Sequence, residues 1–163
     1  MRRVKLDRID RQILRDLQDS GRMTNVELAR RAGISAPPCL RRVRALEEAG
    51  VLRGYHADVN PEPLGFGVSV FALVGLHSQA QSDLRAFEQL VSAWDEVREM
   101  HMLQGETDFL LRIVAVDGPS YQQFLDTKLT AAPNVAQVRS FQTLRSAKQL
   151  PGVPIAVEPK PAV

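Results

Sequence analysis

Apolar side chains recur at steps of three and four residues over the first part of the chain, the pattern of an amphipathic helix. The stripe consists of Leu6, Ile9, Ile13, Leu14 and Leu17. We predict that this helix ends around Ser20 and Gly21, with the glycine in a left-handed stop. A shorter helix is predicted after Thr24, which has the spacing of a capping box with Glu27, and it breaks at Gly33.

A third stripe lies between Ser35 and Gly50 and predicts a helix with prolines in its first turn. At about 100° per residue, its apolar side consists of Cys39, Leu40, Val43 and Leu46. Arg41 points away from that side, with Arg42 and Arg44 flanking it. Helix, short helix, glycine turn and helix is the order of a helix-turn-helix, so we predict that the arginines project outward as a positive crest.

Double-stranded DNA is the expected partner of this crest, because a major groove admits a helix with phosphates at its rim and guanine acceptors on its floor. The alternative is a solvated face on which the arginines pair with Glu47 and Glu48. Residues 51–60 are predicted to be an extended wing that brings Arg53 near the DNA backbone. The residues expected at the DNA are Thr24, Asn25, Ser35, Pro38, Arg41, Arg42, Arg44 and Arg53.

From Phe66 onwards, apolar positions with the period of strands alternate with stretches of helical spacing. Strands are predicted at 66–77, 97–104, 109–116 and 135–144. Helices are predicted at 81–92 and from Asp117 to about Leu129. The order strand, helix, strand, strand, helix, strand predicts a ferredoxin-like α+β domain, with both helices on one face of an antiparallel sheet.

The first of these strands, FGVSVFALVGLH, is apolar at both alternating sets of positions. A strand that is buried on both faces needs two coverings, and the helices supply only one. We therefore expect the open face to meet a second copy of the chain, which makes a homodimer the smallest assembly.

The composition of Asn60-Pro61-Glu62-Pro63-Leu64-Gly65 is that of a linker. We predict a helix-turn-helix domain at 1–60, a linker at 61–65, a ferredoxin-like domain at 66–148 and a proline-rich tail at 149–163. Residues 1–60 contain 13 Lys and Arg against 8 Asp and Glu, a balance of +5, whereas residues 61–163 contain 8 against 11, a balance of −3. A basic front half is typical of a nucleic-acid module joined to a second module.

Few side chains are suited to catalysis or to metal binding. The single cysteine, Cys39, excludes an intrachain disulfide framework, and His56, His77 and His101 lack metal-ligand spacing. Phosphate-binding and nucleophile motifs are absent, so we expect no cofactor, no metal and no enzymatic activity. No apolar run approaches the ~20 residues of a membrane span and the first residues lack a signal-peptide core, so a cytoplasmic protein is expected.

Several stretches, in this order and at these spacings, resemble the Lrp/AsnC family of bacterial and archaeal transcription regulators. They are LDRIDRQIL with LQDSGR, ELARRAGIS, CLRRVRALEEAGVLRGY, LGF and GETDFLL, and they span Leu6 to about Lys148. The resemblance implies a DNA-binding domain, a dimer-forming domain that senses small amino acids, and assembly of the dimers into larger discs such as tetramers or octamers.

The chain departs from the family pattern at three places. Its third helix begins with SAPP rather than the commoner SPTP, and Phe109 stands where the family usually has tyrosine. The tail beyond about Gln149 falls outside the shared pattern.

The resemblance also implies an effector site at the loop between the second and third strands, with help from the last strand. Gly105 lets a carboxylate approach backbone N–H groups, and Asp108 is suited to an α-ammonium group. Alternatively, this loop is only a hairpin turn in which Asp108 caps its own backbone. The residues expected at the effector are His101, Gln104, Gly105, Thr107, Asp108, Phe141, Gln142 and Thr143.

The function predicted from these features is sequence-specific transcription regulation in response to a small amino acid. One alternative is an architectural protein that wraps DNA through its basic face without a physiological ligand. A second is a small ferredoxin-like enzyme with an accessory helix-turn-helix, against which the missing catalytic residues argue.

Overall fold

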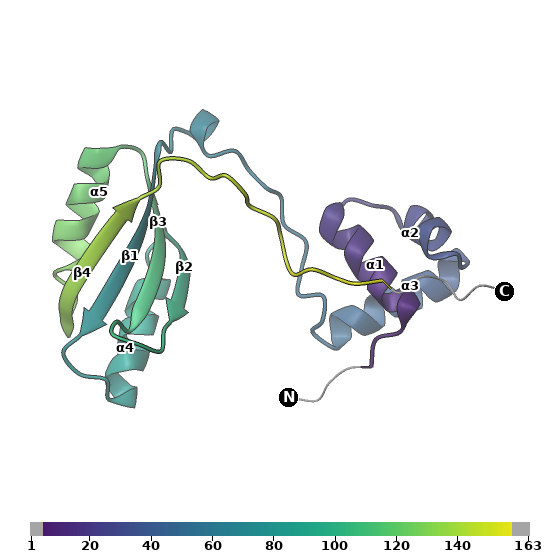
Figure 1. The fold of residues 1–163 in the computed structure, drawn as a ribbon, viewed down its shortest axis with the longest axis horizontal. Helices are drawn as coiled ribbons and strands as arrows, with labels where there is room; N and C mark the ends of the chain where they lie inside the picture. The colour runs from purple at the N-terminus through teal and green to yellow at the C-terminus, as the bar shows by residue number, and fades with distance from the viewer. Residues whose placement is uncertain (1–4, 158–163) are drawn as a thin grey trace. The chain divides into compact units, whose positions relative to one another are not determined.

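The structure of the protein is a computed structural model that describes residues 5–157 (Figure 1). Its contacts divide the described chain into two compact units. The first combines the residues up to Asp58 with the segment that begins at Lys148, and the second is Val59–Ala147. The described tail from Lys148 thus belongs by its contacts to the same unit as the N-terminal helices.

The N-terminal unit contains the predicted helix-turn-helix, formed by α1 (Arg8–Asp19), α2 (Asn25–Ala32) and α3 (Ala36–Glu48). Gly33 ends α2 in a left-handed conformation with φ of 71°. The next N–H group, that of Ile34, donates to the carbonyl of Ala29 at 3.0 Å. This closure leaves a short turn before Ser35, the residue that precedes α3.

The predicted left-handed stop at Gly21 is wrong. α1 ends at Asp19, and Ser20 is extended while its N–H group donates to the carbonyl of Asp16 at 2.9 Å. The positive-φ residues of the structure do not include Gly21. An extended residue already turns the chain out of the helix here, so no left-handed residue is needed.

The predicted capping box of α2 forms only in half. The Thr24 hydroxyl accepts from the N–H group of Glu27 at 3.3 Å, whereas the Glu27 carboxylate pairs with Arg31 at 3.1 Å. A reciprocal box lies instead at the start of α1, where Asp7 and Asp10 each accept from the other's backbone N–H group, at 2.8 and 3.1 Å respectively. Aspartate at both positions replaces the usual combination of Ser or Thr with Glu, so the sequence signal was easily missed.

The three helices enclose one apolar core. It consists of Ile13, Leu14, Leu17, Leu28, Ala29, Ala32, Cys39, Val43 and Leu46. Leu40 was expected on the apolar side of α3 but is 39% exposed, because it lies beside rather than within the stripe that faces the other helices. The predicted wing, residues 51–60, is irregular and contains no strand.

The second unit is the predicted ferredoxin-like α+β fold. Its elements are β1 (Val68–Leu76), α4 (Gln81–Ser92), β2 (Val97–Met102), β3 (Phe109–Ala115), α5 (Gly118–Phe124) and β4 (Val135–Gln142). The strand order is β2-β3-β1-β4, and all neighbouring strands are antiparallel. A 3-10 turn at Glu62–Leu64 precedes β1, and a π-helical turn at Leu125–Leu129 continues α5.

Both helices pack on the same face of this sheet (Figure 1). From α4, the ring of Phe87 lies 5.0 Å from that of Phe109 on β3. Trp94 meets Phe124 of α5 edge-on at 5.5 Å. The core between the helices and the sheet includes Ala72, Val74, Leu76, Phe109, Leu111 and Ile113.

The opposite face of the sheet is open in the single chain. Val70, on the helix side of β1, is 2% exposed, whereas its neighbour Phe71 is 36% exposed on the open side. Phe71 pairs in register with Phe141 of β4, which is 56% exposed, and with Arg112 of β3. The expectation that β1 is covered on both faces is therefore met on one face only within a single chain.

Candidate functional site

The three arginines of α3 do not form one outward crest. Arg41 and Arg44 are exposed, and within residues 5–157 neither takes part in an ion pair. Arg42 instead reaches back to α1, where its Nη1 atom lies 2.7 Å from Asp7 Oδ2 and 2.7 Å from Asp10 Oδ1. The prediction that Arg42 projects outward is therefore wrong, because the acidic capping box of α1 holds this guanidinium.

The pKa shifts of Arg42 and Asp7 agree with the geometry of these contacts. The hydrogen bonds to Asp10 and Asp7 raise the pKa of Arg42. Partial burial opposes the ionisation of Asp7, but the Asp10 N–H group and the Arg42 guanidinium outweigh it and lower the pKa of Asp7. Both charges are thus stabilised at neutral pH, and α3 is fastened to the first turn of α1.

The start of α3 is positioned by the turn that precedes it. The Asn25 side chain donates to the carbonyl of Ala36 at 2.8 Å and so bridges the first turns of α2 and α3. Ser35 precedes the helix, is exposed and makes no side-chain capping bond. Pro38 lies in the first turn and is half-buried. Asn25 and Thr24 therefore form hydrogen bonds within the unit, whereas the Ser35 side chain caps no helix.

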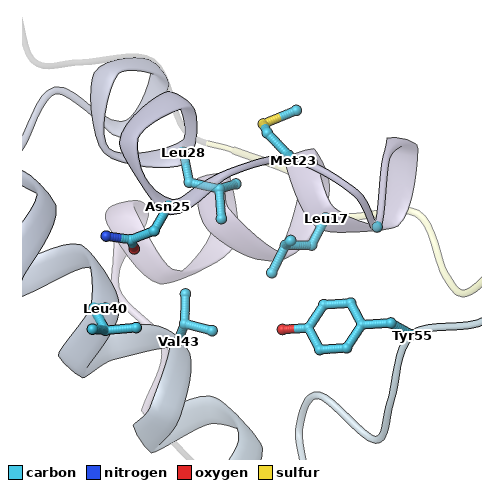
Figure 2. Close-up of a pocket in the computed structure, with 8 residues that line it drawn as sticks. Leu17, Met23, Asn25, Leu28, Leu40, Val43 and Tyr55 are labelled. Atoms are coloured by element: carbon cyan, nitrogen blue, oxygen red, sulfur yellow. The ribbon is translucent and has the colours of Figure 1, made fainter.

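A cavity of about 200 Å³ opens beside α3 in the same unit (Figure 2). Leu17, Met23, Leu28, Val43 and Tyr55 lie around it, together with Gly21, Asn25 and Leu40. The Tyr55 hydroxyl donates to Glu47 at 2.9 Å, and burial together with this carboxylate raises the pKa of Tyr55 to about 12. Among the described residues, Glu47 thus pairs with Tyr55 and not with an arginine of α3.

A second, larger cavity lies in the ferredoxin-like unit, at one end of the sheet. It measures about 360 Å³ and is lined by Gln79, Leu84, Met102, Leu103, Gln104, Gly105 and Asp108. The β2–β3 loop supplies one wall, and the turn after β1 and the first turn of α4 supply the other. The cavity therefore combines the polar side chains of Gln79, Gln104 and Asp108 with the apolar side chains of Leu84, Met102 and Leu103.

Asp108 holds this cavity together. It is 8% exposed, and its carboxylate accepts from the backbone N–H group of Leu76 at 2.7 Å and from Nε2 of Gln79 at 2.8 Å. Its backbone bonds to Val74 and Leu103 fix the loop between β2 and β3. The carboxylate thus links three segments, and each oxygen retains capacity for a second donor.

The predicted effector residues fall into two groups. Gln104, Gly105 and Asp108 line the cavity, and Gly105 has a φ of 156° with open space around its Cα. His101, Thr107, Phe141, Gln142 and Thr143 do not line it. β4 and β2 form opposite edges of the sheet, so one chain cannot bring the last strand to the β2–β3 loop.

The remaining predicted residues have separate environments. Thr107 is buried, and the exposed His101 lies 3.4 Å from Glu99, which also accepts from Arg112 at 2.6 Å. The Arg112 hydrogen bond lowers the pKa of Glu99. The N–H group of Thr143 donates to Ser69 at 2.8 Å, the last bond of β4 to the sheet.

Sequence reasoning missed Gln79 and Leu84. Both stand on the far side of the cavity from the glycine loop, and Gln79 is 29 positions from its partner Asp108. No local motif signals a glutamine in a turn ahead of a helix. Only the closure of the fold identifies it.

A helix-turn-helix with exposed arginines, joined to a separate cavity-bearing α+β domain, defines the class of two-domain DNA-binding regulators. Residues 6–53 match the family model of winged helix-turn-helix DNA-binding domains, and residues 69–153 match that of the Lrp/AsnC ligand binding domain. The chain therefore belongs to the Lrp/AsnC family of DNA-binding transcriptional regulators.

Similar proteins agree with this assignment. The leucine-responsive regulatory protein of Rhizobium meliloti (strain 1021) is 55% identical over 146 residues, which cover 90% of this chain and 94% of that protein. The protein of the same name from Escherichia coli (strain K12) is 39% identical over 144 residues, 88% of each chain.

Solved structures of regulators are also similar. A Neisseria meningitidis transcriptional regulator in complex with L-Met has a TM-score of 0.86 at 37% identity, over 92% of this chain and 97% of that chain. Escherichia coli AsnC has a TM-score of 0.81 at 25% identity, over 90% and 97%. The alternative of a purely architectural protein is not favoured, because the second domain matches a ligand-binding family. Within residues 5–157, no helix is long and apolar enough to cross a membrane.

Proposed function

We propose that this regulator binds a free amino acid with an apolar side chain in the 360 Å³ cavity and changes its DNA binding or assembly in response. The observation that carries the proposal is the mixed lining of the cavity, in which polar groups lie beside the apolar side chains of Leu84, Met102 and Leu103. A free amino acid needs donors for its carboxylate, acceptors for its ammonium group and an environment for its side chain. The Neisseria relative in complex with L-Met supports the same ligand class.

The cavity offers each of these groups. Backbone N–H groups around Gly105 are suited to a carboxylate, since no side chain blocks the approach. The ammonium group would meet the free lone pairs of Asp108 and the Gln79 carbonyl oxygen, whose amide is oriented by the bond to Asp108. Leu84 and Met102 would receive an apolar side chain of the size of leucine or methionine.

The test is calorimetric titration of the full chain with L-leucine and L-methionine, after a thermal-shift screen of the proteinogenic amino acids. L-Lysine serves as the charged control ligand. Leu84→Ala should weaken binding, whereas Leu90→Ala should not, because Leu90 lies on the same helix but does not line the cavity. Equal affinities of both variants, or a preference for L-lysine, would contradict the proposed site.

At the DNA, we assign base contact to Arg41 and phosphate contact to Arg44, Arg53 and Ser35. Their exposure and their lack of intramolecular ion pairs within residues 5–157 support these roles. An exposed guanidinium suits bidentate contact with guanine, and a hydroxyl suits a phosphate oxygen.

We further propose that the open face of the sheet joins two copies of the chain, and that the dimers assemble into tetramers or octamers in the cytoplasm. Phe71 and Phe141 place aromatic surface on this face beside Arg112. A second chain would also bring the edge strand β4, with Gln142 and Thr143, within reach of a neighbouring copy. We assign the chain no enzymatic activity and no cofactor, in keeping with a family of transcriptional regulators.

A further inference from the structure

The proline-rich tail docks on α1 of the DNA-binding unit. Gln18 and Val153 exchange two hydrogen bonds: Gln18 Nε2 donates to the Val153 carbonyl at 2.8 Å, and the Val153 N–H group donates to Gln18 Oε1 at 3.1 Å. The side-chain amide thereby pairs with the tail as a neighbouring strand would. These residues are 135 positions apart, so the contact is not a consequence of local chain geometry.

Apolar packing adds to these hydrogen bonds. Ile155 is half-buried and packs against the core of the three helices. Leu150 and Val153 turn their side chains to solvent, at 72% and 64% exposure. The tail therefore contacts the DNA-binding unit at two positions, through its backbone at Val153 and through its side chain at Ile155.

The sequence of the tail suits this conformation. Gly152 has a φ of 66°, and a Cβ at this position would collide with the Gln18 side chain. Pro151 and Pro154 flank Gly152 and Val153. Their rings restrict the backbone of the undocked tail, which reduces the conformational entropy lost on docking. The proline-glycine composition, which by itself suggests a loose end, is thus compatible with a specific contact.

We propose that residues 150–157 are a docking segment that transmits the state of β4 to the DNA-binding helices. Thr143 makes the last bond of β4 to the sheet, and the chain then runs through 144–149 to the docked tail. α1, which receives the tail through Gln18, is fastened to α3 by the Arg42–Asp10 pair. A change at the end of β4 therefore has a route to α3 that is separate from the linker before β1. The route follows the chain as far as Val153 and continues through the Gln18 hydrogen bonds and the Arg42–Asp10 ion pair. The regulatory part of this inference rests on the proposed ligand response.

The docking itself is tested by hydrogen exchange in the full chain, followed by mass spectrometry. Gly152→Val and Gln18→Ala should accelerate exchange in residues 150–157 and in α1 and leave the strands β1 and β3 unchanged. Leu150→Ala is the matched control in the same tail, and it should exchange like the unmodified protein. A tail that exchanges at the rate of free peptide in the unmodified protein would overturn the docking.

The transmission is tested by DNA affinity with and without saturating L-leucine or L-methionine. The dissociation constant of the DNA complex should differ between the presence and the absence of the amino acid. We expect this difference both for the unmodified protein and for Leu150→Ala. Gly152→Val and Gln18→Ala should bind the amino acid with unchanged affinity and lose that difference. If Gly152→Val and Gln18→Ala kept the full effect of the amino acid on DNA affinity, the proposed transmission through the tail would be overturned. An unmodified protein that binds neither amino acid would overturn the proposed function and the transmission together, while hydrogen exchange would still decide the docking.

Discussion

Arg42 of α3 places its Nη1 atom 2.7 Å from Oδ1 of Asp10, so one arginine of the DNA-reading helix is committed to holding that helix in place. Asp10 is only 15% exposed at its side chain, and it also closes the capping box of α1 through the Asp7 N–H group. Arg41 and Arg44 are exposed, and these are the arginines of α3 for which we propose contact with DNA. In this proposal the arginine that positions the helix is distinct from those that contact DNA.

Arg42→Ala should therefore destabilise the DNA-binding unit, because it leaves the half-buried carboxylate of Asp10 without its cation. We expect a loss of roughly 1 kcal/mol in the free energy of unfolding, the size for a partly exposed, hydrogen-bonded charge pair. Chemical denaturation of the full chain measures it. Arg44→Ala is the control and should leave stability unchanged. Equal stability of the two variants would mean that the pair contributes nothing to the fold.

The contact of Arg42 with Asp7 should make part of the stability sensitive to acid. The pKa of Asp7 is lowered in the folded state, so its contribution is present above the ordinary carboxyl pKa of 3.8 and is lost as the pH falls through the lowered value. The stability difference between the unmodified protein and Arg42→Ala should accordingly be constant at neutral pH and shrink below that pKa. Denaturation curves at a series of pH values give the difference directly. A difference that grows on acidification would contradict the assignment.

Substitutions of Arg41 and Arg44 should have different effects on DNA binding. If Arg41 reads a base edge, Arg41→Ala should cost about 1–3 kcal/mol on a specific site and little on a scrambled duplex. Arg44→Ala should weaken both duplexes alike and reduce the slope of affinity against salt by about one counterion. Fluorescence anisotropy at several salt concentrations measures both effects. Unchanged affinity and slope in both variants would remove α3 from the groove.

The boundaries of helices and strands could be predicted well, because each depends only on the spacing of apolar residues within that one element. The helix predicted at 81–92 is α4, and the strands differ from prediction mainly at their ends. Periodicity reports which face of an element is buried, as at Cys39 and Val43 of α3. The glycine loop of the cavity, with Gly105, was predicted from the family resemblance and not from periodicity.

The partners of polar groups could not be predicted in the same way. Arg42 is 35 positions from Asp7, so a helical wheel of α3 places it on a flank and says nothing about the carboxylates that turn it inward. The place of Gln79 in the cavity could not be predicted for the same reason, because it depends on a hydrogen bond to Asp108, 29 positions away, that forms only in the folded chain. Periodicity fixes the direction of a side chain, whereas its partner depends on how distant segments meet.

Asp108 and Gln79 should differ in their effects on stability. Asp108→Ala leaves the buried N–H group of Leu76 without an acceptor, which costs about 1–3 kcal/mol of stability in addition to abolishing the amino-acid response. Gln79→Ala should weaken binding of the amino acid. It should nearly preserve the free energy of unfolding, because no backbone group loses its hydrogen-bond partner. Calorimetry and denaturation on both variants make the comparison. Ligand affinity that is equal to the unmodified protein in both variants would place the effector outside this cavity.

The two faces of β1 provide the last prediction. Val70 is 2% exposed beneath the helices, so Val70→Asp would bury an unpaired carboxylate and should prevent stable folding. Phe71→Asp lies on the open face opposite Arg112, where a carboxylate has a cation beside it, so the chain should fold but lose the dimer. Leu90→Asp, on α4 and 37% exposed, is the control and should keep both the fold and the assembly. Light scattering with circular dichroism distinguishes the three. A Phe71→Asp protein with the mass of the unmodified assembly would show that the chains join through another surface.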